Sequence, residues 1–196
     1  YGDSQDQEIL FHKLKTNNSD YLEQEKLNMV YAIVRKAYQA AEYESEPVHL
    51  EGLLMTNFSK FNIKENFGYS FQSLHQLASI ANISGAHSKN YHDVALFFEY
   101  RIRKLQGGAG DVEKFLTYQI KLLYTVAHIY FRKKQFAKSM KYLEDMHQQM
   151  ERYNKRYYNE YFVRYTTMRA LNYNFRGDHQ LAALEIDKLF DMRMFK

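Results

Sequence analysis

Two sets of side chains with helical spacing carry the hydrogen-bond donors and aromatic rings of a binding surface. Steps of three and four residues place the members of each set on one face of a helix. If both helices are the first members of hairpins in register, the two faces turn inward towards a shared concave groove. The candidate ligand-binding residues are Lys121, Tyr124, His128 and Arg132 in one set and Arg164, Thr167, Leu171 and Asn174 in the other.

Donors beside aromatic rings suit an extended peptide or an acidic ligand group. Two other interpretations stay open at this point. The groove is solvated and unoccupied, or it is filled by the terminal helix of the chain itself.

Basic and aromatic residues also interleave between residues 151 and 165, where four Lys or Arg and five Tyr occur. Such a segment can stack bases and contact phosphates of single-stranded nucleic acid, and its affinity would then fall steeply with salt. We favour the other interpretation, in which the Tyr rings pack between neighbouring helices and leave their hydroxyls at the edge. A protein, peptide or small-ligand partner is therefore expected in preference to nucleic acid.

The chain offers no arrangement that predicts catalysis or metal binding. It has no Cys, and no two of its eight His are three or four residues apart, so neither a thiolate nor a paired-imidazole zinc site is predicted. The glycine-rich run 107–110 lacks the Gly-Lys-Ser/Thr ending of a phosphate loop and is interpreted as a hinge. We expect no catalytic residue, no metal and no cofactor.

Apolar periodicity predicts that helices position these residues, and no segment alternates long enough to form a strand. A first helix with an apolar stripe of Ile9, Leu10 and Leu14 is expected to end at residues 16–18, before a second begins near Leu22. About nine helices are predicted in all, over 7–15, 22–44, 48–61, 69–88, 91–105, 111–134, 135–154, 156–175 and 179–192.

The second half of the chain repeats itself with a nearly constant offset. Ser139 and Ala182 lie 43 residues apart, as do the predicted turns at Lys134 and Gly177. A fixed period predicts stacked helical hairpins, because one hairpin cannot bury its apolar stripe without a neighbour. The expected fold is therefore all-α, a right-handed α-solenoid of antiparallel helical hairpins.

The middle hairpin resembles a tetratricopeptide repeat, in which small residues mark the helix crossing and bulky residues fill the space beside it. The residues that carry the resemblance are Leu123, Val126, Ala127, Tyr130, Ser139 and Leu143. The next hairpin keeps Ala170, Tyr173, the Gly177-Asp178 turn, Ala182 and Ile186. It departs from the pattern at Thr166 and Arg169, where bulky and aliphatic residues are expected.

A weaker match precedes these two hairpins, at Ala78, Ala81, Asn82, Gly85, Val94 and Phe98. The period is longer than the family's roughly 34 residues, so each helix is expected to be about one turn longer. The resemblance covers about residues 69–192. We accordingly expect N-terminal helices over 1–68 that pack on repeats over 69–196, in one continuous solenoid truncated at its C-terminus.

Degenerate, aromatic-rich repeats without an initiator Met are similar to the N-terminal sensor regions of bacterial two-component histidine kinases and related regulators. That resemblance implies a non-enzymatic sensor or interaction region in signal transduction, with any histidine kinase module lying outside it. A single-stranded nucleic-acid-binding repeat protein is the alternative. The Tyr-rich terminal helices also suggest a homodimer.

Composition agrees with a folded helical domain of moderate charge. The 196 residues are 45% hydrophobic and 26% charged, with one Pro and a net charge of +4. No run approaches the roughly 18 to 20 apolar residues that cross a bilayer, so we expect no membrane insertion by this region. The absence of Cys leaves the compartment open. Either a removed signal peptide or a trimmed chain would explain the missing Met. Of the possible locations, a periplasmic or other extracytoplasmic one is expected rather than a cytoplasmic one.

Overall fold

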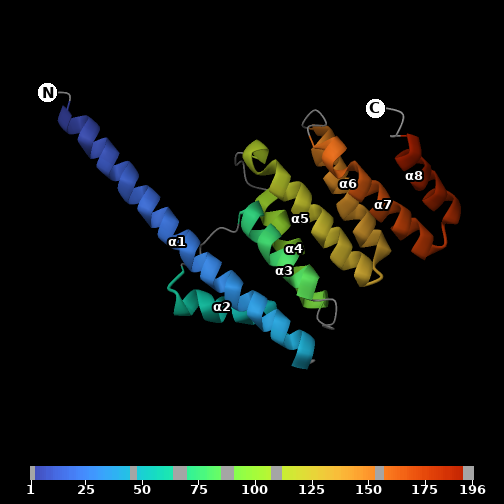
Figure 1. Ribbon diagram of the computed structural model, residues 1–196, viewed down its shortest axis with the longest axis horizontal. Helices are drawn as coiled ribbons and strands as arrows, with labels where there is room; N and C mark the ends of the chain where they lie inside the picture. Colours follow the sequence, from blue (N-terminus) through green and yellow to red (C-terminus); the bar gives the residue numbers. More distant parts are fainter. Residues whose placement is uncertain are drawn as a thin grey trace.

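The protein is all-helical, as expected from the sequence. The computed structural model describes residues 3–44, 48–63, 70–84, 91–106, 112–152 and 157–191, and no strand occurs among them. Figure 1 shows α3 to α8 following one another in chain order across the molecule. The eight helices of this part of the chain are α1 (Asp3–Glu44), α2 (Leu50–Lys60), α3 (Phe71–Ser84), α4 (Tyr91–Gln106), α5 (Val112–Arg132), α6 (Phe136–Arg152), α7 (Tyr158–Arg176) and α8 (His179–Asp191).

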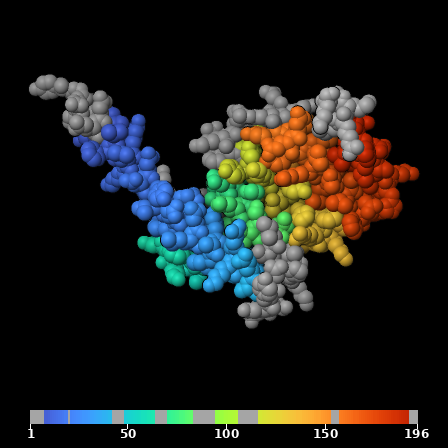
Figure 2. Space-filling model, in the orientation of Figure 1, coloured from blue at the N-terminus to red at the C-terminus, as the bar shows by residue number. Residues whose placement is uncertain are grey.

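The break expected near residues 16–18 is wrong, because α1 is one continuous helix of 42 residues. The Thr16 hydroxyl donates to the carbonyl of His12, four residues back, at 2.9 Å, so this side chain is accommodated inside the helix instead of ending it. The predicted apolar stripe is also wrong, since Ile9, Leu10 and Leu14 are each at least half exposed. Figures 1 and 2 show this outer half of α1 projecting away from the other helices.

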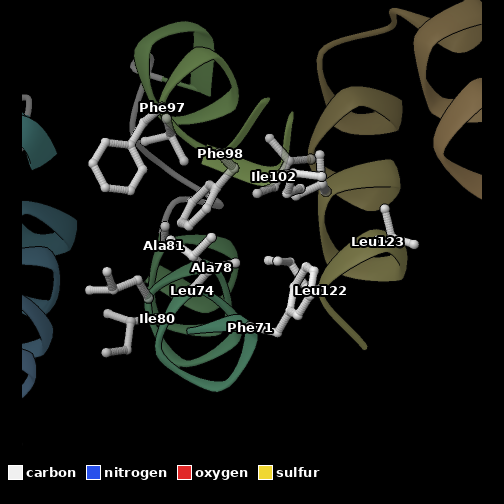
Figure 3. Close-up of a cluster of buried hydrophobic side chains, with 14 of the residues drawn as sticks. Phe71, Leu74, Ala78, Ile80, Ala81, Phe97, Phe98, Ile102, Leu122 and Leu123 are labelled. Carbon is white, nitrogen blue, oxygen red and sulfur yellow. The ribbon is translucent and has the colours of Figure 1, made fainter. Parts of the chain in front are cut away.

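The inner half of α1 carries a buried face and packs on α2 and α3. Leu27, Val30, Tyr31, Val34 and Tyr38 recur at three- and four-residue steps and are almost fully buried. They belong to the same buried cluster as the side chains of α3, α4 and α5 that Figure 3 shows. The division into residues 1–68 and 69–196 stays a prediction.

Helix α5 lies at the centre of the packing and contacts α3, α4, α6 and α7. Its own partner is α6, while α7 pairs with α8. The residues predicted to fill the crossing of α5 and α6 are all at most 1% exposed, namely Leu123, Val126, Ala127, Tyr130, Ser139 and Leu143. Both small side chains, Ala127 and Ser139, are buried as the pattern expected, and their place at the crossing of the two helices stays a prediction.

The α7–α8 pair follows the same pattern with two differences. Ala170 and Ala182 are buried as expected, but the prediction of a packed Ile186 is wrong, because this side chain is 44% exposed. Among the described helices α8 contacts α7 alone, and so nothing covers the side that bears Ile186. At Arg169 an ion pair with Glu185 of α8 stands in place of the expected aliphatic contact.

The turns at residues 134 and 177 have the same backbone hydrogen bonds. Lys134 and Gly177 both have positive φ, 58° and 88°. The amide after each turn residue donates to the carbonyl four residues before the turn residue, Gln135 to Tyr130 at 3.0 Å and Asp178 to Tyr173 at 2.9 Å. This is the hydrogen-bond pattern of an α-helix that ends at a residue in the left-handed conformation. The offset of 43 residues seen in the sequence is therefore repeated in backbone geometry.

Candidate functional site

The eight predicted ligand-binding residues lie on α5 and α7, which are in contact. We call these residues together the α5–α7 face. Lys121, Tyr124 and His128 are half-buried, and the other five are exposed. Burial raises the pKa of the Tyr124 hydroxyl, and the positive charge of Arg164 on α7 opposes that rise. The two sets thus approach each other at Tyr124 and Arg164.

Three members of the α5–α7 face already have side-chain hydrogen-bond partners inside the protein, and one of them is Asn174, whose Oδ1 lies 3.0 Å from Nδ1 of His179. Arg132 donates from Nη1 to the carbonyl oxygen of Asn82 on α3 at 2.9 Å. This carbonyl lies in the last turn of α3, where no amide of the helix itself can reach it, and a cation at this end also meets the negative end of the helix dipole. Nδ1 of His128 lies 2.9 Å from Oδ1 of the same Asn82. His128 and Arg132 therefore hold α5 to α3, and their role towards a ligand stays a prediction.

The imidazole of His128 is in an environment that disfavours its protonation. Burial lowers its pKa below the ordinary value of 6.5, and the nearby charge of Arg132 lowers it further. The ring is consequently neutral at pH 7 and acts as a hydrogen-bonding group without charge. The positive charge of the α5–α7 face comes from Lys121, Arg132 and Arg164.

Carboxylates, but not cations, are divided unevenly between two sets of helices. Helices α3, α5 and α7 together contain six Lys or Arg and two Glu. Helices α4, α6 and α8 contain seven Lys or Arg and eight Asp or Glu. Each member of the α5–α7 face is either basic or uncharged.

A concave feature that the sequence did not reveal lies between α1 and α3. It is an open cavity of about 420 Å³. His75 lies on the side of this cavity that is nearest α5, with its ring 6.2 Å from that of Tyr118. Burial lowers the pKa of His75, and the charge of Lys121 lowers it further. Lys121 itself does not line the cavity.

Two Tyr rings of the segment 151–165 are buried, as the favoured interpretation expected, but the hydroxyl of Tyr161 is buried as well and does not lie at an edge as that interpretation also expected. Tyr161 is 1% and Tyr165 is 5% exposed. The ring of Tyr165 stacks on His147 of α6 at 5.1 Å, and its hydroxyl accepts a hydrogen bond from Arg169 at 2.6 Å. Bases cannot stack on faces that other side chains already cover. Residues 153–156 lie outside the described part of the chain.

No group of three or more His, Asp or Glu is close enough to bind a metal ion within the described ranges. The glycine-rich run 107–110 is outside these ranges. Among the helices that the structure describes, none is both long and apolar enough to span a membrane.

Comparison of the chain with known proteins identifies no relative. No protein-family model matches it, no curated protein matches it, and no solved structure matches it.

Proposed function

We propose that this chain is a non-enzymatic binding domain, a right-handed, tetratricopeptide-like α-solenoid of antiparallel hairpins. Its α5–α7 face would hold an acidic, extended segment of a partner protein or peptide, or a small ligand with an acidic group. Support for the repeat comes from the turns 43 residues apart with matching hydrogen bonds and from the buried crossing residues of α5 and α6. Stacked hairpins commonly present such an extended surface for binding.

The observation that carries the binding function is the set of cations on the α5–α7 face without a carboxylate among them. Lys121 precedes Tyr124 by three residues on α5, and the charge of Arg164 on α7 acts on the Tyr124 hydroxyl, so a carboxylate beside Tyr124 would interact with two positive charges and one phenol. Arg132 adds charge nearby while it holds α3. An anionic segment fits this combination better than a cationic or wholly apolar one.

Fluorescence polarisation with a labelled deca-glutamate peptide tests this function. The K121Q/R164Q variant removes two cations of the face, and K13Q/K15Q removes two exposed cations from the outer half of α1 as a matched control. We expect at least about a tenfold loss of affinity in the first variant, since 1.4 kcal/mol corresponds to a factor of ten. The control should bind like the parent. Equal binding by all three proteins would contradict the proposed role of the face.

An oligo-dT strand with the same charge as the deca-glutamate peptide tests the nucleic-acid alternative. Its affinity is measured at two salt concentrations. Tighter binding of the strand than of the peptide, with a steep salt dependence, would favour nucleic acid instead. The buried Tyr161 and Tyr165 lead us to expect the peptide to bind more tightly.

We further propose a sensor or interaction role in a bacterial signal-transduction protein and an extracytoplasmic location, on the resemblance described above. A membrane span or signalling coiled coil encoded directly beside these residues would support this role. A homodimer is part of the same hypothesis, and exposed apolar side chains on α8, such as Leu181, Leu184 and Phe190, are compatible with it. Light scattering of the purified chain measures its oligomeric state.

A further inference from the structure

The open cavity between α1 and α3 has the volume of a small-molecule site. Its volume of about 420 Å³ lies within the range of roughly 300 to 1,000 Å³ that ligand pockets occupy. Two helices form it. The residues at one helical face of α1 are Asn28, Tyr31, Ala32, Arg35, Lys36 and Gln39, and those of α3 are His75, Gln76, Ser79 and Ile80.

Positive charge dominates this cavity. Arg35 and Lys36 are the charged lining residues, and no carboxylate lines it. Both side chains are exposed, and neither forms an ion pair or hydrogen bond with any residue that the structure describes. The residues one turn away along α1 are uncharged as well. Two neighbouring cations without a counter-charge favour an anion from solution.

The remaining lining residues add an apolar surface and neutral polar groups. Tyr31 and Ile80 are at most 8% exposed and supply apolar surface beside the two cations. Three amide side chains, the Ser79 hydroxyl and the His75 imidazole supply hydrogen-bonding groups. An inorganic anion would leave the apolar surface exposed to water. A neutral apolar molecule would leave the charges of Arg35 and Lys36 without a counter-charge. A molecule with both parts satisfies the whole cavity.

We propose that the α1–α3 cavity binds a small organic anion, an apolar or aromatic body that carries a carboxylate or a phosphate, with Arg35 and Lys36 as its counter-charges. This site is separate from the α5–α7 face. It does not depend on the function proposed for that face, because the residues that form it are on other helices.

His75 provides a spectroscopic reporter for the bound anion. The imidazole lines the cavity, and Nε2 lies 3.3 Å from Oγ of Ser79. A negative charge beside the ring stabilises its protonated form, and so binding should raise the pKa of His75. NMR titration of the imidazole signals with and without ligand measures this change. The His128 ring, which is outside the cavity lining, serves as an internal reference.

The experiment uses isothermal titration with four probes: phenyl phosphate, benzoate, benzyl alcohol and inorganic phosphate. We expect phenyl phosphate or benzoate to bind more tightly than both benzyl alcohol and inorganic phosphate, each of which has only half of the required chemistry. The stronger of the two organic anions identifies the charged group that the cavity prefers.

Two variants separate the charge of the cavity from its volume. R35Q/K36Q removes both cations and should lower the affinity for the organic anion at least about tenfold. Ala32→Phe fills the cavity from an exposed position of α1 and should reduce binding by a similar factor while both cations remain. The K13Q/K15Q control, on the same helix but outside the cavity, should bind like the parent protein.

Two results would overturn the site. One is equal affinity for the organic anion in R35Q/K36Q and the parent. The other is a benzyl alcohol affinity as high as that of benzoate, because the cations would then contribute nothing. A loss of deca-glutamate binding in K121Q/R164Q says nothing about the cavity, so the two sites can fail independently.

Discussion

Arg169 and Glu185 form the ion pair that joins α7 to α8, and replacing Arg169 with Met should destabilise the fold measurably. The guanidinium lies 3.1 Å from Oε1 of Glu185, and Lys188 reaches the same oxygen at 2.9 Å. Glu185 is only 4% exposed. Removing Arg169 leaves a buried carboxylate with one partner, Lys188, whose side chain is half exposed.

The expected loss can be bounded from this geometry. Breaking a fully buried pair by removing one partner costs about 3 to 5 kcal/mol. Here Lys188 still contacts the carboxylate, and the side chain of Arg169 is 19% exposed. We therefore expect Arg169→Met to lower the free energy of unfolding by about 2 to 3 kcal/mol, which at this chain length corresponds to a fall in Tm of roughly 5 to 10 °C.

Urea denaturation followed by circular dichroism at 222 nm measures this loss. Arg176→Met is a matched control, because Arg176 ends the same helix and pairs with Asp178 at 3.3 Å in an exposed position. Its cost should stay below about 1 kcal/mol. The double variant R169M/E185M should recover most of the loss, since no unpaired charge remains buried. Our reasoning would be refuted if Arg169→Met cost no more than Arg176→Met, or if the double variant were less stable than Arg169→Met.

Two further predictions concern α5. Ala127→Leu inserts a large side chain into the crossing with α6 and should cost about 1 to 3 kcal/mol, whereas Ala137→Leu on the exposed side of α6 should cost little in the same urea titration. Tyr130→Phe removes the hydrogen bond to Glu99 at 2.6 Å, which is the main cause that lowers the pKa of Glu99 below 4.5. A lowered carboxyl pKa stabilises the fold above the unfolded pKa, so the stability gap between parent and Tyr130→Phe should be widest near neutral pH and shrink as pH falls below about 4.5. A gap that stays constant from pH 7 to pH 3 would contradict this role of Glu99.

The sequence predicted those parts of the fold that depend on local pattern. Three- and four-residue periodicity indicated α4 to α8 to within a few residues, and the recurrence of small residues located the buried Ala127 and Ser139. The turns at Lys134 and Gly177 were also found, since both interrupt an apolar period at the same offset.

Parts of the fold that depend on exposure or on distant partners could not be predicted. Residues 16–18 look like a helix end, but polar side chains are tolerated in a helix that is surrounded by water, and Thr16 bonds to its own backbone. The link from His128 and Arg132 to Asn82 spans 46 and 50 residues, so no local pattern could indicate it.

The candidate site was predicted only in part for the same reason. The spacing of residues on α5 and α7 was visible in the sequence. The cavity was not, because it needs Arg35 of α1 and His75 of α3 to be brought together by packing. The apolar periodicity of one helix does not indicate which other helix will pack beside it.

The unsupported half of α1 has a consequence for how this helix melts. Each side chain described from Glu8 to Leu22 is exposed, so these turns gain little from tertiary packing. An isolated helix of this length is marginal in water because starting it is costly. Here the half held by α2 and α3 serves as the nucleus, and the outer turns only extend it. Warming should therefore unwind the exposed turns of α1 before its packed half and before the packed helices separate.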